Sequence, residues 1–136
     1  MTTAAQVAPL EQKRWMTWTG RVFSAIPVLV LAMSAAMGLQ HGPEVVAGMA
    51  RFGYSENLTT LVAVLALSSA LLYAIPRTAV LGAILMTAYF GAAVATHVRI
   101  GDPGWPLAIL MAIFTWGGLS GRNARLRDLL PLRKPF

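Results

Sequence analysis

His97, Arg99 and Asp102 are residue types that could do chemistry, and they lie close together in one stretch of the chain. An imidazole beside a carboxylate can accept or donate a proton, and a guanidinium can bind an anion or a carbonyl oxygen. The spacing predicts a proton-handling or ligand-binding site with His97, Arg99 and Asp102 as the candidate catalytic residues. The alternative is a histidine that only hydrogen-bonds to a neighbouring helix or to water.

The chain has a second histidine, His41, and both histidines are expected near the ends of helices. Two imidazoles from diagonal helices of a bundle could hold a haem iron or a metal ion. No carboxylate at a fixed ligand spacing accompanies them, so we predict no metal site and no bound cofactor, with haem or a quinone as the alternatives.

Aromatic side chains form the second group of candidates, since they could line a pocket for a flat lipophilic molecule such as a quinone. They could equally be lipid-facing. The aromatic candidates are Tyr89, Phe90, Phe114 and Trp116. With the histidines added, the predicted ligand-binding residues are His41, Tyr89, His97 and Trp116.

Several classes of chemistry are excluded by what the chain lacks. It has no cysteine, which excludes thiol nucleophiles, disulfides and cysteine-ligated metal sites. It also has no nucleotide-binding glycine pattern, no nucleophile elbow and no His-Glu-x-x-His motif, so ATP-driven transport, acyl transfer and metalloprotease activity have no support.

The elements that must position these residues are expected to be membrane helices. Of the 136 residues, 57% are apolar and 12% are charged, whereas soluble domains have about 25% charged residues. Four runs lack Asp, Glu, Lys and Arg and are apolar on all sides, unlike the helices of a soluble bundle. We therefore predict an all-α, integral membrane four-helix bundle with spans at Val22–Leu39, Leu58–Ile75, Thr78–Val98 and Trp105–Gly121.

A cleaved signal peptide is the alternative for the first run, whose length favours an uncleaved span. Pro43, Glu44 and an apolar stripe that ends near Gly53 predict a short amphipathic surface helix between the first and second spans. Tyr73 is expected at the headgroup level. Small residues four apart predict the packing faces, which are Ala32 and Ala36, Ala66 to Ala74, Ala83 to Ala95, and Ala108 and Ala112.

The distribution of positive charge predicts the orientation. Nine of the eleven Lys and Arg residues fall on the side that holds both termini, and only Arg51 and Arg99 fall on the other. This asymmetry places both termini in the cytoplasm of a multi-pass protein, which we expect in a bacterial cytoplasmic (inner) membrane. Residues 1–19 are the expected N-terminal tail, 20–121 the membrane domain and 122–136 a basic C-terminal tail.

Three segments carry a resemblance to a known family. The Tyr73-Ala-Ile-Pro-Arg-Thr segment, the Ala95-Thr-His-Val-Arg segment and the Gly101-Asp-Pro loop occur in an order and spacing similar to those of the DoxX-like family of small membrane proteins. The resemblance covers about residues 20–132. It implies a four-helix bundle and a kinship with membrane subunits of thiosulfate:quinone oxidoreductase.

The chain departs from the family pattern at two positions. Relatives commonly have a Lys late in the first span and a Glu in the middle of the second, where this chain has Gly38 and Ala66. Because an intramembrane acid or base is absent, the resemblance implies an accessory or structural subunit of a redox, quinone-linked system. The alternative is a small membrane enzyme or binding protein for a lipophilic substrate or quinone that uses His97, Arg99 and Asp102.

The expected partners follow from the same observations. They are the lipid bilayer and a membrane or redox protein, with a homo-oligomer as the alternative. The basic residues serve orientation and attraction to anionic lipid, so no nucleic acid is expected.

Overall fold

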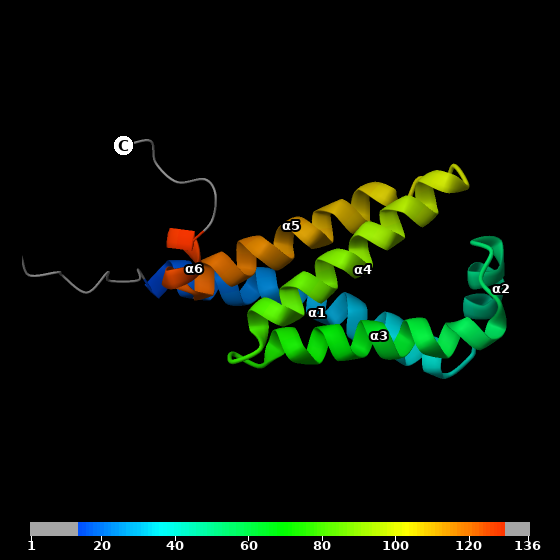
Figure 1. Ribbon diagram of the computed structural model, residues 1–136, viewed down its shortest axis with the longest axis horizontal. Coiled ribbons are helices and arrows are strands. Elements are labelled where there is room, and N and C mark those ends of the chain that lie inside the picture. The colour runs from blue at the N-terminus through cyan, green and yellow to red at the C-terminus, as the bar shows by residue number, and fades with distance from the viewer. Residues whose placement is uncertain (1–13, 130–136) are drawn as a thin grey trace, which may run out of the picture.

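The computed structural model describes residues 14–129, and every regular element in that range is a helix (Figure 1). This confirms the all-α fold class for the described residues. The predicted tails lie partly outside them, at 1–13 and 130–136. The helices are α1 (Arg14–Leu39), α2 (Pro43–Arg51), α3 (Glu56–Ala74), α4 (Ala79–Arg99), α5 (Trp105–Arg122) and α6 (Ala124–Leu129).

The four long helices pack as a closed ring. Helix α1 contacts α3 and α5, and α4 contacts the same two helices, so that α1 and α4 lie on a diagonal. Figure 1 shows the α4 and α5 pair diverging from the α1 and α3 pair toward the end where α2 lies. The molecule is therefore narrow at the end that holds the start of α1 and wide at the other.

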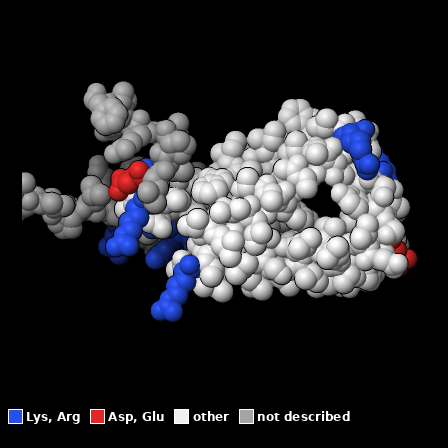
Figure 2. Space-filling view, in the orientation of Figure 1, with Lys and Arg blue, Asp and Glu red and all other residues white. Residues whose placement is uncertain are grey.

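Three helices in the described range, α1, α3 and α4, are long and apolar enough to cross a membrane. Charged side chains gather at the two ends of the molecule, and the surface between them shows none (Figure 2). Helix α3 ends at Ala74 because Ile75 precedes Pro76 and takes an extended backbone, one residue before the predicted end.

At the narrow end, α1 and α5 meet backbone to backbone through glycines. A Cβ atom built on Gly20 would lie 2.8 Å from the carbonyl carbon of Gly121, and one built on Gly118 would lie 2.6 Å from the amide nitrogen of Ser24. Real Cβ atoms do not approach backbone atoms so closely. The absence of side chains at these positions is what brings the two helices together.

The predicted small-residue faces are confirmed at Ala66, Ala70, Ala83 and Ala108, which are buried, but not along their whole length. On α1, Ala36 is exposed and Ala32 is only partly buried. On α4, Gly91 and Ala95 are exposed and Thr87 is only partly buried. The reason is geometric, because a strict spacing of four advances about 40° per step around a helix with 3.6 residues per turn. Mixed steps of three and four stay on one face, and the buried residues of α1 follow them at Gly20, Ser24, Pro27, Leu31, Ala35 and Gly38.

Tyr73 is a core residue, and its predicted place among the headgroups is wrong. Its side chain is fully buried, and its hydroxyl donates to the Thr115 carbonyl at 2.7 Å. Since that bond uses the only hydroxyl proton of Tyr73, the Ser24 hydroxyl must donate to Tyr73 across their 2.9 Å contact. One phenol thus connects α1, α3 and α5 inside the bundle.

Candidate functional site

A cavity with polar groups in its wall lies beneath α2, at the wide end. This cavity has a volume of about 590 Å³, within the range of small-molecule sites in proteins. Figure 2 shows its opening as a hollow between α4 and α3. Its walls come from α1, α2, α3 and α4 and are formed by Ser34, Met49, Phe52, Tyr54, Val62, Leu65, Ser69, Leu85, Ala88, Tyr89, Ala92, Ala93, Thr96 and His97.

His97 is the ionisable residue of the cavity wall, and its ring is oriented by Asp102. The Nδ1 atom of His97 lies 2.8 Å from Oδ1 of Asp102. The same carboxylate oxygen accepts the backbone N–H of Gly104 at 2.8 Å, and the backbone N–H of Asp102 donates to the His97 carbonyl at 2.9 Å. The loop between α4 and α5 therefore folds back so that its carboxylate meets the last turn of α4.

These contacts also control the charge of Asp102. The hydrogen bond from the Gly104 N–H, followed by the bond with His97, holds the pKa of the Asp102 carboxyl below its usual value. Arg51, at the end of α2, adds an ion pair at 3.6 Å to Oδ2. Of the two neutral tautomers of His97, an ionised Asp102 favours the one with its proton on Nδ1, in which the lone pair is on Nε2.

Arg99 does not join the pair of His97 and Asp102. Its guanidinium donates to the Phe52 carbonyl, at the C-terminal end of α2. The Phe52 ring meets the His97 ring edge to face, with the centroids 4.8 Å apart. Arg99 is thus a residue that fastens α2 over the cavity, and Arg51, which the sequence reasoning missed, is the cation beside Asp102.

Tyr89 lines the cavity, and so does Ser34 of α1. Tyr54 contacts Thr96 at 3.2 Å between the two hydroxyl oxygens. Tyr54 therefore connects the segment after α2 to α4.

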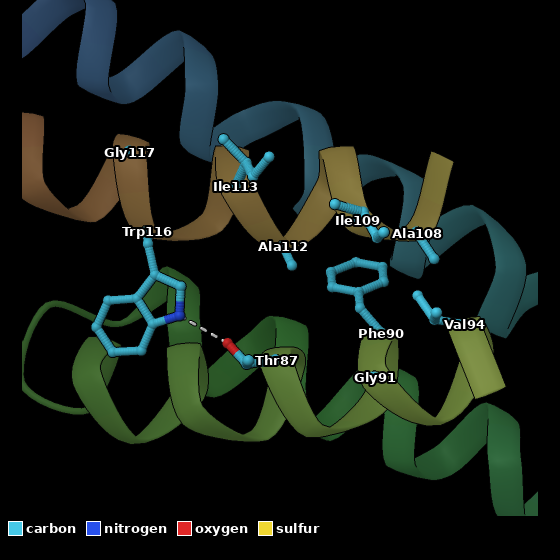
Figure 3. Close-up of a pocket in the computed structure, with 10 residues that line it drawn as sticks. All are labelled: Thr87, Phe90, Gly91, Val94, Ala108, Ile109, Ala112, Ile113, Trp116 and Gly117. Atoms are coloured by element: carbon cyan, nitrogen blue, oxygen red, sulfur yellow. Dashed lines mark hydrogen bonds between the residues drawn. The ribbon is translucent and has the colours of Figure 1, made fainter. Parts of the chain in front are cut away.

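His41 and Trp116 lie elsewhere. His41 is exposed, with Nε2 2.9 Å from the Thr60 hydroxyl, and it is not part of the cavity wall. Trp116 lies in an open apolar groove of about 520 Å³ between α4 and α5, where its indole N–H donates to Thr87 at 2.7 Å (Figure 3). The structure does not bring the two histidines to one cavity, nor Trp116 and Tyr89.

Phe90 lies between the other aromatic candidates, because it lines the same groove as Trp116 and its ring meets that of Tyr89 edge to face, with the centroids 5.9 Å apart. Phe114 packs instead on Phe23 of α1 with the ring centroids 5.1 Å apart. Among residues 14–129 no group of three or more His, Cys, Asp or Glu side chains is arranged to hold a metal ion.

The chain matches the sequence pattern of a protein family. The model of the DoxX-like family matches residues 22–118, which is more than half of the chain and reaches from α1 into α5. The match is shorter than the stretch of resemblance noted from the sequence. No curated protein and no solved structure matches the chain. The family match, together with helices that are long and apolar enough to cross a membrane, shows that the chain is a membrane protein belonging to the DoxX-like family.

Proposed function

We propose that the protein is a four-span membrane protein that binds a lipophilic small molecule in the cavity beneath α2. The observation that carries the binding function is the cavity itself. It is about 590 Å³ in volume, its walls are mostly apolar, and its few polar groups include an imidazole with an unoccupied nitrogen. Small-molecule sites have this composition, in which apolar walls provide affinity and a few polar groups provide orientation.

The fourth span in this proposal is α5. It has 18 residues, which corresponds to about 27 Å of helix, and it packs along both α1 and α4. Its only charged residue is the last one, Arg122. A helix that lies in the ring between two candidate spans shares their surroundings, so α5 is expected to cross the same bilayer.

Both termini would then lie in the cytoplasm of a bacterial inner membrane, with α2 on the opposite surface. The arginines support this orientation, because Arg51 and Arg99 lie at the α2 end and the other described arginines lie toward the opposite end. The chain has no cysteine, so single cysteines can report on it directly. In intact cells an impermeant maleimide should label Pro103→Cys and not Arg77→Cys, and the reverse pattern would overturn the orientation.

The binding function can be tested by filling the cavity. Ala92 and Ala95 are both on α4, but only Ala92 lines the cavity. A photoreactive lipophilic probe, an alkylphenol with a diazirine in its chain, should label peptides of the cavity wall in the purified protein. Ala92→Leu should reduce that labelling severalfold, and Ala95→Leu should not. Equal labelling of both variants would contradict the proposal.

An accessory role in a quinone-linked redox system is the second candidate, favoured by membership of the DoxX-like family. A quinol, the reduced form of a quinone, is itself a lipophilic molecule with a hydroxyl-bearing head, so the two candidates share one cavity. This role predicts that purification in a mild detergent recovers a redox enzyme subunit in a fixed ratio to the protein. Repeated recovery of the protein alone would contradict it.

A further inference from the structure

We propose that the cavity selects a lipophilic molecule whose head donates a hydrogen bond, a phenol or an alcohol, and that Nε2 of His97 is the acceptor. This inference rests on the proposed binding function and names the chemical class of the ligand. It follows from counting which hydrogen-bonding atoms of the cavity are already used within the protein.

Three hydroxyl protons of the cavity wall are already used within the protein. Thr96 donates to the Ala92 carbonyl at 2.8 Å, so the hydroxyl of Tyr54 must be the donor in its contact with Thr96. Ser69 donates to the Leu65 carbonyl at 2.7 Å. These three side chains therefore offer oxygen lone pairs, and no hydroxyl proton, to a molecule in the cavity.

His97 offers a lone pair as well. Its Nδ1 proton is directed to Asp102, and that carboxylate is held by the Gly104 N–H and by Arg51. The other ring nitrogen, Nε2, has no hydrogen-bond partner among the described residues and is not one of their buried unpaired atoms. In the neutral imidazole this accessible nitrogen is a hydrogen-bond acceptor.

Ser34 and Tyr89 are the exception. Their hydroxyls can each donate or accept a hydrogen bond toward a molecule in the cavity. This pair can bind a head group that donates a hydrogen bond or one that only accepts it, and therefore does not discriminate between them. Selectivity therefore depends on His97 and the acceptors beside it.

The consequence for the ligand is a preference between head groups of similar size. A hydroxyl head can donate its proton to Nε2. An ether or carbonyl oxygen has no proton to donate, so its lone pair would face the lone pair of Nε2, and Nε2 would be desolvated without a partner. Sites of this kind reject the analogue that lacks the donor, because the bound molecule excludes water from the acceptor and an unpaired, desolvated polar group is costly. The aliphatic wall residues, among them Val62, Leu65 and Leu85, would receive the apolar part.

The experiment compares 4-heptylphenol with its methyl ether, 4-heptylanisole, by titration calorimetry of the protein in lipid nanodiscs. It is done at about pH 8, above the range in which imidazoles become protonated. The native protein should bind the phenol about tenfold or more tightly than the ether, the factor expected from one unpaired acceptor. His97→Leu should reduce this preference toward one.

His41→Asn is the matched control, because it removes the other imidazole and suits a residue with φ of 50°. It should keep the native preference. If His97→Leu does not fold, Asp102→Asn provides a second measurement. This variant keeps the side-chain shape but no longer holds the proton on Nδ1, so the preference for the phenol should again fall.

The outcomes separate the inference from the function on which it rests. Equal or tighter binding of the ether by the native protein, or an unchanged preference in His97→Leu, would overturn the choice of ligand class while leaving cavity binding intact. Failure of both probes to bind, or binding that Ala92→Leu does not weaken, would overturn the binding function itself.

Discussion

The imidazole of His97 fills the space in which the side chain of residue 104 would begin. A Cβ atom built on Gly104 would lie 2.8 Å from Cε1 and 2.9 Å from Nδ1 of His97. Only glycine at position 104 leaves room for the His97 ring beside Asp102, because any Cβ atom there would meet the ring. The bond between His97 and Asp102 therefore depends on a residue that takes no part in it.

Gly104→Ala should displace the His97 ring and break its contact with Asp102. The free energy of unfolding should fall by about 1–3 kcal/mol, as in other overpacked sites, and the preference for the phenol should fall with it. Thermal unfolding in detergent and the calorimetric titration provide the two measurements. Gly91→Ala is the control, because nothing lies within 4 Å of its Cβ position. A native ligand preference in Gly104→Ala would contradict this prediction.

The crossing of α1 and α5 should tolerate a methyl group at Gly117 of α5 but not at the neighbouring Gly118. In Gly118→Ala the new Cβ would meet the Ser24 backbone, which cannot move aside as a flexible side chain can. We expect a loss of about 1–3 kcal/mol in unfolding free energy. At Gly117 the nearest atom is 3.9 Å away, so Gly117→Ala should match or exceed native stability. Similar melting of the two variants would be inconsistent with the described crossing.

Tyr73→Phe should destabilise the bundle more than Tyr54→Phe. Without the phenol, the buried hydroxyl of Ser24 loses its partner and the Thr115 carbonyl loses a donor. An unsatisfied buried group costs about 1–3 kcal/mol. Tyr54 makes one partly buried bond, to Thr96, so its loss should have a smaller effect. The check is chemical unfolding followed by circular dichroism, and an equal loss in the two variants would argue against Tyr73 as the stronger connection.

Asp102 should make stability depend on pH in the acid range. Its pKa is lowered in the folded protein, first by the Gly104 N–H and then by His97. Its contribution is therefore complete above the ordinary carboxyl pKa of about 3.9 and is lost as the pH falls through the lower folded value. Asp102→Asn should be less stable than the native protein near neutral pH, and the gap should narrow below about pH 4. Melting temperatures of the native protein and of Asp102→Asn, measured from neutral pH to below about pH 4, test this prediction. A difference between the two that does not change with pH would contradict it.

The helices could be predicted because the apolar runs are long and their ends carry strong signals. Pro76 stops α3, and uncharged residues between Arg77 and Arg99 make one continuous helix. The part of α1 before the predicted span, residues 14–21, could not be inferred from apolarity, since it includes two arginines and two threonines. The burial of Tyr73 could not be inferred either, because it depends on which face of α3 meets Ser24 and Thr115.

The candidate site was predictable only where its residues are close in the chain. His97 and Asp102 are five residues apart at a helix end, and a turn brings them together. Arg51 and Phe52 reach them from another segment, and only the packing of α2 across the wide end places them there. Arg99 was grouped with His97 for the same reason of proximity, yet its contact lies with the Phe52 carbonyl.

The divergence of the two helix pairs toward α2 has a consequence for the surrounding lipid (Figure 1). In the proposed orientation, the protein occupies a larger cross-section in the outer leaflet than in the inner one. Each copy then displaces unequal numbers of lipids from the two monolayers. Such a wedge is better accommodated where the bilayer bends than where it is flat.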